Sequence, residues 1–382
     1  MNFDNFSQEA QTKRHFILIG GFLGSGKTTL IGSRVSHLEK QKQKVALITN
    51  DQGEGLMDTD SARQASSRAG NVAEITGGCF CCRLEELVAA IKDLEDSGRP
   101  DVMIAEPVGS CTDLMATVLK PLEEIYKTPL TLAPLAVLLD ARRSLAAVGG
   151  KPARRSFHRD IGYVYLKQVE EAEWLIVNKR DLLKDEEINE LKNKLSEKYP
   201  EKKVYLVSAK TGHGLEEFFD DLLQSKSTPP ESIEMDYERY AEGEAMLGWV
   251  NMQAAVTLEA EPGGWLHAVG QEIARLLNEN EHEVGHFKMS LTGRGKRWRI
   301  HQVMGEDEVE LIEESLAAEA RGEDSGGTPE LRLLVNLRAE GDAETLQGFV
   351  HQALKNGDSA EIVYQQEAAF QPGKPEPTHR VS

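Results

Sequence analysis

The sequence predicts an α/β protein in which a mostly parallel sheet, covered by helices, is followed by a smaller α+β domain. In the first part of the chain, short apolar runs of strand length alternate with segments of helical periodicity, which is typical of a parallel sheet. A stretch rich in Ser, Pro and Glu then interrupts the pattern. We expect a flexible arm (1–14), the sheet domain (15–225), a linker (226–244), the α+β domain (245–370) and a disordered Pro-rich tail (371–382).

Most of the expected strands of the first domain end in polar residues. Strands are expected near 16–19, 45–50, 72–75, 101–106, 135–139, 174–177 and 204–207, and helices over 27–40, 83–95 and 215–223. The carboxyl ends of parallel strands share one edge of a sheet, and open α/β sheets bind their ligands at that edge. The polar residues after these strands are therefore the first candidates for a functional site.

The second domain shows two strand–helix–strand units. Strands are expected at 246–258, 286–291, 297–303, 331–337 and 361–364, and helices at 265–277, 306–320 and 344–354, the second of these helices being acidic. Two such units favour a ferredoxin-like α+β domain with an antiparallel sheet and helices on one face.

A glycine-rich loop follows the first expected strand and precedes a helix. Gly21, Gly26, Lys27 and Thr28 fit the pattern G-x-x-x-x-G-K-[ST], in which backbone N–H groups and the helix N-terminus surround a polyphosphate. Lys27 is expected to reach the β- and γ-phosphates, and the Thr28 hydroxyl to bind Mg²⁺. The expected phosphate-binding residues are Gly21, Gly24, Ser25, Gly26, Lys27, Thr28 and Thr29.

A second motif predicts which base is bound. Asn178, Lys179 and Asp181 form N-K-x-D after a buried strand, and a carboxylate at the last position can accept two hydrogen bonds from guanine that adenine does not offer. The next strand ends in the S-A-K sequence of Ser208, Ala209 and Lys210, where a backbone N–H can meet the guanine O6. Together with the phosphate loop, the two motifs favour GTP and GDP as ligands.

Two carboxylates are candidates for the magnesium side of the site. Asp51 follows the second strand, and Glu106 ends the strand after the cysteines. Mg²⁺ favours a hydroxyl, one or two carboxylates and water, so Thr28, Asp51 and Glu106 form a suitable set. Lys27, Thr28 and Glu106 are the residues expected to act in hydrolysis. No Gln follows Gly109 to position water, which fits slow intrinsic hydrolysis.

Three of the four cysteines lie within four positions, at Cys79, Cys81 and Cys82. Three thiolates at this spacing repel one another, and a soft divalent cation removes that penalty. We expect them to bind Zn²⁺ or Co²⁺, with a fourth position left open for transfer. Cys111 is a weaker candidate for the fourth ligand, and we interpret it as a buried core thiol.

The composition limits the kinds of partner and the compartment that we expect. The net charge of −19 disfavours nucleic acid, no window approaches the length of a membrane span, and the polar first residues lack a signal peptide core. Clustered rather than dispersed cysteines favour a reduced compartment, so we expect a cytoplasmic protein.

These motifs, in this order, resemble those of the CobW-type metallochaperone GTPases. The matching segments are residues 20–29, 50–54, 78–82, 106–109 and 178–181. The resemblance implies GTP hydrolysis coupled to delivery of Zn²⁺ or Co²⁺ to a client metalloprotein or metalloenzyme, with the three cysteines binding the cargo. Three features depart from the family pattern: Asp51 stands where many members have Glu, a His-rich tract is absent, and Glu106 begins Glu-Pro-Val-Gly rather than the usual Glu-Thr-Thr-Gly.

The sequence leaves two alternative functions open beside that of a metal-delivering GTPase. One is a metal-independent G-protein chaperone that gates loading of a cofactor, for example a corrinoid, into a client enzyme. The other is a P-loop kinase of a small molecule, which guanine recognition by Asp181 argues against. A nucleotide-dependent homodimer is left open.

Overall fold

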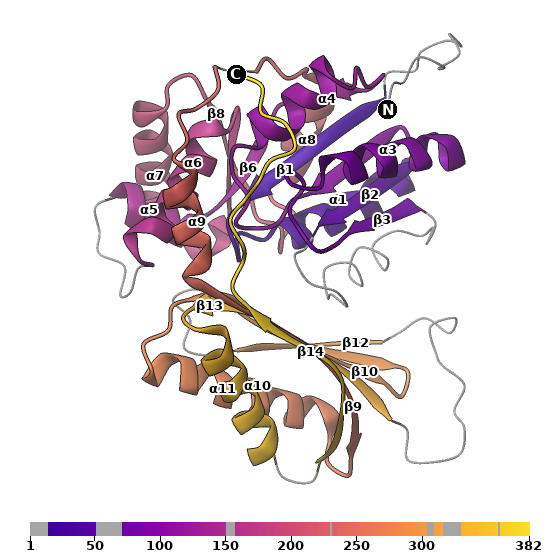
Figure 1. Cartoon of the computed structure of the whole chain (residues 1–382), viewed down its shortest axis with the longest axis vertical. Coiled ribbons are helices and arrows are strands. Elements are labelled where there is room, and N and C mark those ends of the chain that lie inside the picture. Colours follow the sequence, from indigo (N-terminus) through magenta and orange to yellow (C-terminus); the bar gives the residue numbers. More distant parts are fainter. Residues whose placement is uncertain are drawn as a thin grey trace.

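The protein is described by a computed structural model over residues 14–50, 71–149, 157–229, 231–303, 309–315, 330–357 and 360–382. It contains an eight-stranded sheet in the first part of the chain and a six-stranded sheet in the last part (Figure 1). In Figure 1 the helices of the second part lie on the side of its sheet that faces away from the first part. The expected fold class is therefore confirmed.

The first sheet is parallel throughout, with strand order β3-β2-β4-β1-β6-β7-β8 and β5 paired to β1. Its strands are β1 (His15–Gly21), β2 (Val45–Asn50), β3 (Val72–Ile75), β4 (Val102–Glu106), β5 (Thr131–Leu132), β6 (Ala136–Asp140), β7 (Trp174–Asn178) and β8 (Lys203–Leu206). Its helices are α1 (Lys27–Lys40), α3 (Leu84–Gly98), α4 (Lys120–Glu124), α5 (Ala141–Gly149), α6 (Arg159–Glu171), α7 (Asp185–Lys198) and α8 (Leu215–Gln224). The expected alternation of strands and helices is thus present.

The central strand β1 supplies both cores of this sheet. Phe16 and Leu18 belong to the core that includes α3 and α6, whereas Ile17 and Ile19 belong to the core that includes α1 and α8. Successive side chains of a strand point to opposite faces, so an uninterrupted apolar run is what a strand covered on both faces requires. This buried strand delivers the glycine-rich loop to the sheet edge.

The second sheet is antiparallel, with order β12-β11-β10-β13-β9-β14. Its strands are β9 (Leu247–Leu258), β10 (Val284–Gly293), β11 (Lys296–Val303), β12 (Glu310–Ser315), β13 (Leu331–Glu340) and β14 (Ala360–Phe370), and its helices are α10 (Pro262–Glu279) and α11 (Ala343–Asn356). The order β10-β13-β9-β14 is that of a ferredoxin-like unit, and the β11–β12 hairpin extends its edge.

The prediction of an acidic helix over 306–320 is wrong where the structure describes this stretch, because residues 310–315 form strand β12. Antiparallel pairing with β11 places acidic side chains opposite basic ones: Lys296 bonds to Glu313 at 2.6 Å, and Arg299 bonds to Glu314. Cross-strand pairing of this kind outweighs the intrinsic helix preference of glutamate.

The stretch between the two sheets and the last residues are more ordered than their composition predicts. Helix α9 (Tyr237–Ala245) lies largely inside the stretch expected as a linker. Residues 371–382 form no helix or strand, but they run from β14 across the first domain and end beside η2 (Met115–Leu119), where the Val381 N–H donates to the Ala116 carbonyl at 2.9 Å (Figure 1). Hydrogen bonds to the first domain thus replace the apolar burial that this tail lacks. In the described part of the chain, every helix is too short or too polar to cross a bilayer.

Candidate functional site

The phosphate loop joins β1 to α1 and is held by its own residues. Gly26 precedes the helix with a positive φ of 95°, and a Cβ atom there would collide with the Asn178 side chain, so glycine is required. Lys27 begins α1 and is buried, and its Nζ donates to the Gly21 carbonyl at 2.7 Å across the loop. The loop therefore encloses a buried cation at a helix N-terminus, an arrangement that attracts phosphate.

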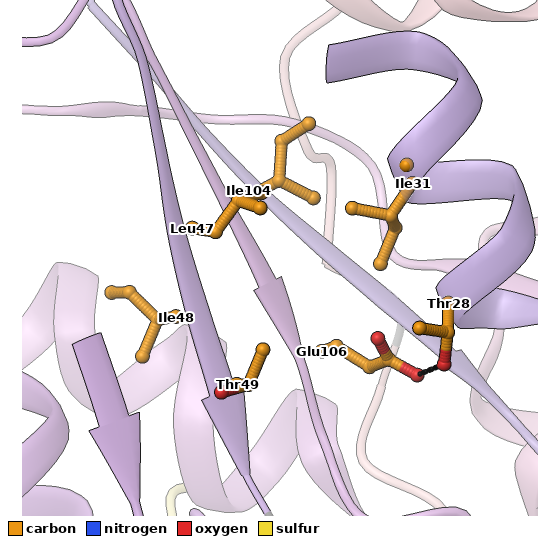
Figure 2. Close-up of a pocket in the computed structure, with 8 residues that line it drawn as sticks. Thr28, Ile31, Leu47, Ile48, Thr49, Ile104 and Glu106 are labelled. Carbon is orange, nitrogen blue, oxygen red and sulfur yellow. Dashed lines mark hydrogen bonds between the residues drawn. The ribbon is translucent and has the colours of Figure 1, made fainter. Parts of the chain in front are cut away.

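The two groups expected at magnesium face each other. The Thr28 hydroxyl, in the first turn of α1, donates to Glu106 Oε1 at the end of β4 over 2.9 Å (Figure 2). A hydroxyl and a carboxylate at this distance match the oxygen ligands that Mg²⁺ takes beside a nucleotide. Asp51, the third expected ligand, lies outside the described residues.

The N-K-x-D residues connect the phosphate loop to the S-A-K loop. Asn178 donates to the Ser25 carbonyl at 2.8 Å and accepts from the Ala209 N–H at 2.9 Å. Burial opposes ionisation of Asp140 at the end of β6, but Lys179, which pairs with it at 2.8 Å, and Arg143 together lower the pKa of that carboxyl. The side-chain amide of Asn178 thus fixes the relative positions of two loops that are distant in the sequence.

A cavity of about 480 Å³ joins most of the expected nucleotide-binding residues. Those that line it are Gly24, Gly26, Lys27, Thr28, Thr29, Glu106, Asn178, Lys179, Asp181, Ala209 and Lys210. Gly21, Ser25 and Ser208 do not line it: they contribute a carbonyl to Lys27, a carbonyl to Asn178 and a hydroxyl that accepts from the Thr211 N–H. The cavity volume is in the range of small-molecule sites.

The far wall of this cavity comes from the second sheet, which the sequence analysis did not predict. Basic side chains project from its uncovered face: Lys288 from β10, Arg299 from β11 and Arg338 from β13. On β12, Glu310 pairs with Lys210 of the S-A-K loop at 2.8 Å. The alternation of Arg297, Arg299 and His301 with apolar residues was the available signal, since it places basic groups on one face of a strand.

The three clustered thiols lie together after β3. Their sulfur atoms are separated by 2.8 Å between Cys79 and Cys81, 3.3 Å between Cys79 and Cys82, and 3.7 Å between Cys81 and Cys82. Zinc–sulfur bonds of about 2.3 Å in a tetrahedron place sulfur atoms about 3.8 Å apart, so a small expansion of this triangle fits a metal ion. Among the described residues, these three form the one group of His, Cys, Asp or Glu side chains spaced to hold a metal.

The thiols share their protons unequally. Hydrogen bonds from the thiols of Cys111, Cys81 and Cys82 lower the pKa of Cys79 well below its ordinary value. A hydrogen bond to Cys79 raises the pKa of Cys82 to about 11. Hydrogen bonds with Cys111 and Cys79 raise the pKa of Cys81 well above its ordinary value. Without a cation, the cluster stabilises one thiolate at the expense of the others, as expected for thiols in mutual contact.

Two connections link the thiol cluster to the nucleotide cavity. Asn50, the last residue of β2, lines the cavity, donates to the Gly78 carbonyl at 2.7 Å and accepts from the Phe80 N–H at 2.8 Å, so it fixes the cysteine loop. On the other side, Gly109 packs so closely on Leu23 of the phosphate loop that a Cβ would overlap its side chain, and the neighbouring Val108 carbonyl accepts from the Cys111 N–H at 3.0 Å. Both elements that touch the nucleotide site therefore also shape the thiol site.

Residues 15–206 match the family described as CobW/HypB/UreG, nucleotide-binding domain. The chain belongs to this family. The matched region contains the phosphate loop, Glu106, the three clustered cysteines and the N-K-x-D motif. The resemblance drawn from the motifs is thereby confirmed, and the second sheet lies beyond the matched region.

Curated relatives of the CobW/HypB/UreG family match in parts. The zinc chaperone YeiR of Escherichia coli is 40% identical over 93 residues, which cover 24% of this chain and 27% of that protein. The zinc-regulated GTPase metalloprotein activator 1 of Dictyostelium discoideum is 25% identical over 211 residues, covering 49% and 44%. The chain thus spans about a quarter to less than half of the length of these relatives.

Solved structures of the same family align at low identity. Zn(II)-bound YjiA GTPase from E. coli is 14% identical with a TM-score of 0.34, and the alignment covers 90% of this chain and 99% of that one. HypB from Helicobacter pylori in complex with nickel is 20% identical with a TM-score of 0.39, covering 57% and 91%.

Proposed function

We propose that this chain is a cytoplasmic GTPase that couples GTP binding and hydrolysis to the delivery of Zn²⁺ or Co²⁺ to a client metalloprotein. The observation that carries the proposal is the pair of connections between the two sites. Asn50 and the segment from Glu106 to Gly109 each touch the nucleotide cavity and the surroundings of the thiols. A change in the nucleotide bound at the cavity can therefore alter the geometry of the thiol cluster.

The nucleotide part of the proposal rests on charge and shape. The chain carries a net charge of −19, yet its cavity is lined by Lys27, Lys179, Lys210, Lys288 and Arg338. Local cationic groups in a strongly acidic protein favour a polyphosphate at this place. Asp181 lines the cavity and is exposed, so it is accessible to a guanine base.

In GTP hydrolysis, each residue around the phosphates has its own role. Lys27 and the N-terminus of α1 stabilise negative charge on the β- and γ-phosphates. Thr28 and Glu106 would hold Mg²⁺, which neutralises the charge that develops during transfer to water. Loss of the γ-phosphate removes a ligand from this end and frees Thr28 and Glu106 to return to the direct hydrogen bond seen here.

The relatives support the metal part. Zinc chaperones and a zinc-regulated GTPase metalloprotein activator are among the curated proteins that match parts of this chain. The convergence of three thiols supports the same cargo. It disfavours the metal-independent chaperone and the small-molecule kinase, neither of which uses such a cluster.

The experiment compares the wild-type chain with a variant in which Cys79, Cys81 and Cys82 are all changed to Ser. Reduced protein is titrated with Zn²⁺ and Co²⁺ against a competing chelator, and GTP hydrolysis is measured on the same samples. We expect the variant to lose metal affinity by about 100-fold or more while keeping GDP affinity, because the thiols lie outside the cavity lining. Weak metal binding by the wild type, or equal binding by the variant, would contradict the metal-delivery function and favour the metal-independent chaperone.

A further inference from the structure

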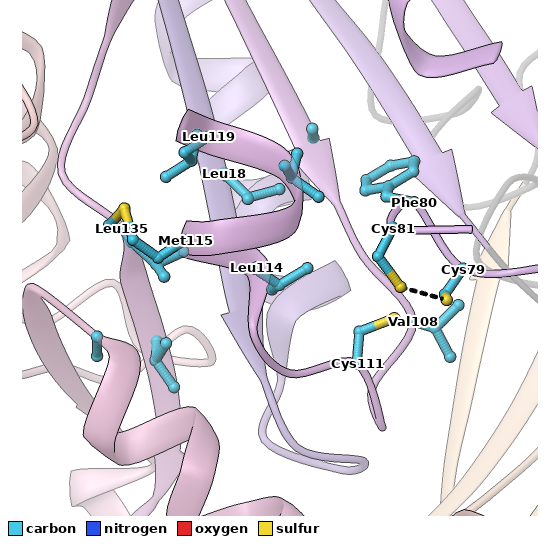
Figure 3. Packing of buried hydrophobic residues seen from close by; sticks show 14 of the residues in the cluster. Leu18, Cys79, Phe80, Cys81, Val108, Cys111, Leu114, Met115, Leu119 and Leu135 are labelled. Carbon is cyan, nitrogen blue, oxygen red and sulfur yellow. Dashed lines mark hydrogen bonds between the residues drawn. The ribbon is translucent and has the colours of Figure 1, made fainter. Parts of the chain in front are cut away.

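The fourth cysteine lies beside the clustered three, although 29 positions separate Cys82 from Cys111 in the sequence. Cys111 follows β4 and is 1% exposed. Figure 3 shows its side chain pointing toward the sulfur atoms of Cys79 and Cys81, which belong to the same buried cluster. Every cysteine of the chain is therefore gathered at one place.

The backbone around Cys111 is held by helices α6 and α9. Gln168 donates to the carbonyls of Gly109, at 3.0 Å, and Cys111, at 2.7 Å. The Ser110 hydroxyl donates to Glu244, which is buried on α9. These bonds satisfy the polar groups of a buried loop and fix the backbone from which the Cys111 side chain projects.

The outer side of the cluster is covered by the C-terminal tail. The Glu376 N–H donates to the Cys82 sulfur at 3.2 Å, and the Thr378 N–H donates to the Cys81 carbonyl at 2.9 Å. Arg380 pairs with Asp113 at 2.7 Å, two residues beyond Cys111. The triangle of sulfur atoms thus has the tail on one side and Cys111 on another, with no His, Asp or Glu of the described residues in range of all three sulfur atoms.

We propose that Cys111 is the fourth thiolate ligand, which closes a four-cysteine site around the metal cargo. Four thiolates satisfy the tetrahedral preference of Zn²⁺ without water, and this replaces the open three-cysteine site expected from the sequence. The inference rests on the metal-binding part of the proposed function. Each thiol gives its proton to solvent when the metal binds, and no electron is transferred.

The fourth bond requires a movement. The Cys111 sulfur is not within 4.8 Å of all three other sulfur atoms, so the loop must approach for the site to close. That loop begins at Glu106, which is bonded to Thr28, and it packs on the phosphate loop through Gly109. Movement of Glu106 onto Mg²⁺ therefore shifts Cys111, and the nucleotide controls whether the site has three thiolates or four.

The direct test is zinc X-ray absorption on the reduced wild-type chain loaded with zinc, Mg²⁺ and a non-hydrolysable GTP analogue, because it needs no variant. Four sulfur neighbours at about 2.3 Å are expected. Three sulfur neighbours and one oxygen or nitrogen would overturn the Cys111 assignment but leave the proposed function intact. A zinc ion with no sulfur neighbours would overturn both.

A pair of variants tests the same assignment by spectroscopy. Co²⁺ titrations of Cys111→Ser should show the thiolate-to-cobalt charge-transfer band reduced by about a quarter, and zinc affinity reduced by about tenfold or more. Val118→Ala is the matched control, because it also alters a buried side chain close to this loop but lies outside the cavity lining and keeps all four sulfur atoms. A Cys111→Ser spectrum and affinity equal to those of the wild type would refute the assignment.

Discussion

The nucleotide cavity and the thiol cluster both lie next to the ends of strands of the first sheet, but they differ in exposure and in charge. The cavity has a volume of about 480 Å³, is lined by both cationic and acidic groups, and lies between the two sheets. The thiols are packed into the core, with Cys79 and Cys81 at most 5% exposed. The difference teaches that one site is built to exchange its ligand with solvent and the other to keep its ligand from solvent.

The two sites are joined by few residues, and that makes the comparison testable. If the cavity acts on the cluster through Asn50 and the loop after Glu106, a change inside one site should leave the other intact. A change in the connecting residues should affect both. The following variants separate these cases, beginning with the largest expected effect.

Lys27→Ala should reduce GTP hydrolysis at the cavity without changing zinc binding by the thiols. We expect GTP hydrolysis to fall by about 100-fold or more, because a buried cation that stabilises phosphate charge is lost. Zinc affinity without nucleotide should stay at the wild-type value, because the Lys27 Nζ bonds to Gly21 within the phosphate loop and lines the cavity. Phosphate release and chelator competition measure the two quantities, with Lys194→Ala on the surface of α7 as the control. Substantial hydrolysis by Lys27→Ala would argue against the phosphate loop as the active site.

Asp181→Asn should change which base the cavity accepts. Loss of the carboxylate removes two hydrogen bonds to guanine, and we expect GTP affinity to fall by about 100-fold relative to xanthosine triphosphate. Competition with a fluorescent nucleotide gives both affinities. Asp185→Asn is the matched control, because Asp185 is exposed at the start of α7 and does not line the cavity. An unchanged preference in Asp181→Asn would place the base elsewhere.

Asn50→Ala should weaken the connection between the sites. It removes hydrogen bonds to Ile75, Gly78 and Phe80, so we expect the free energy of unfolding to fall by about 2–3 kcal/mol and zinc affinity by about tenfold. Urea unfolding and chelator competition give these values. Asn71→Ala is the control, since Asn71 donates to Val45 at the opposite end of β2 and should leave zinc affinity unchanged. Equal zinc affinities for the two variants would show that Asn50 does not position the cysteine loop.

Glu171→Gln tests the buried support behind Cys111, and its effect on stability should depend on pH. Burial raises the pKa of Glu171 to about 8, so the folded chain keeps a proton that the unfolded chain releases above about pH 5. Wild-type stability should therefore decrease as pH rises from about 5 to 8. Gln can replace the protonated acid at Thr112 and Met115.

Urea unfolding at pH 5.5 and pH 8 measures this effect. The free energy of unfolding of the variant, relative to that of the wild type, should increase by up to about 1 kcal/mol per pH unit across this interval. Glu170→Gln, at an exposed position of the same helix, is the comparison. A pH-independent difference between Glu171→Gln and the wild type would mean that Glu171 is ionised in the folded chain.

The parts of the fold and of the site that are local in sequence could be predicted. The loop from Gly21 to Thr28 and the triplet of cysteines are contiguous, so spacing alone reveals them. Cys111, the cationic wall of the cavity and the tail over Cys82 depend on tertiary contacts between distant segments, which no local pattern encodes. Strand β12 was missed for a related reason, because its partners on β11 outweigh its helix preference.

The central claim is that nucleotide and metal are energetically coupled, and one thermodynamic cycle tests it directly. Zinc affinity of the wild type is measured by chelator competition with GDP and with a non-hydrolysable GTP analogue, and the affinities for both nucleotides are measured with and without zinc. The account predicts that the two zinc affinities differ by about fivefold or more, and that zinc changes the nucleotide preference by the same factor, as linkage requires. Equal zinc affinities in the two nucleotide states would contradict it.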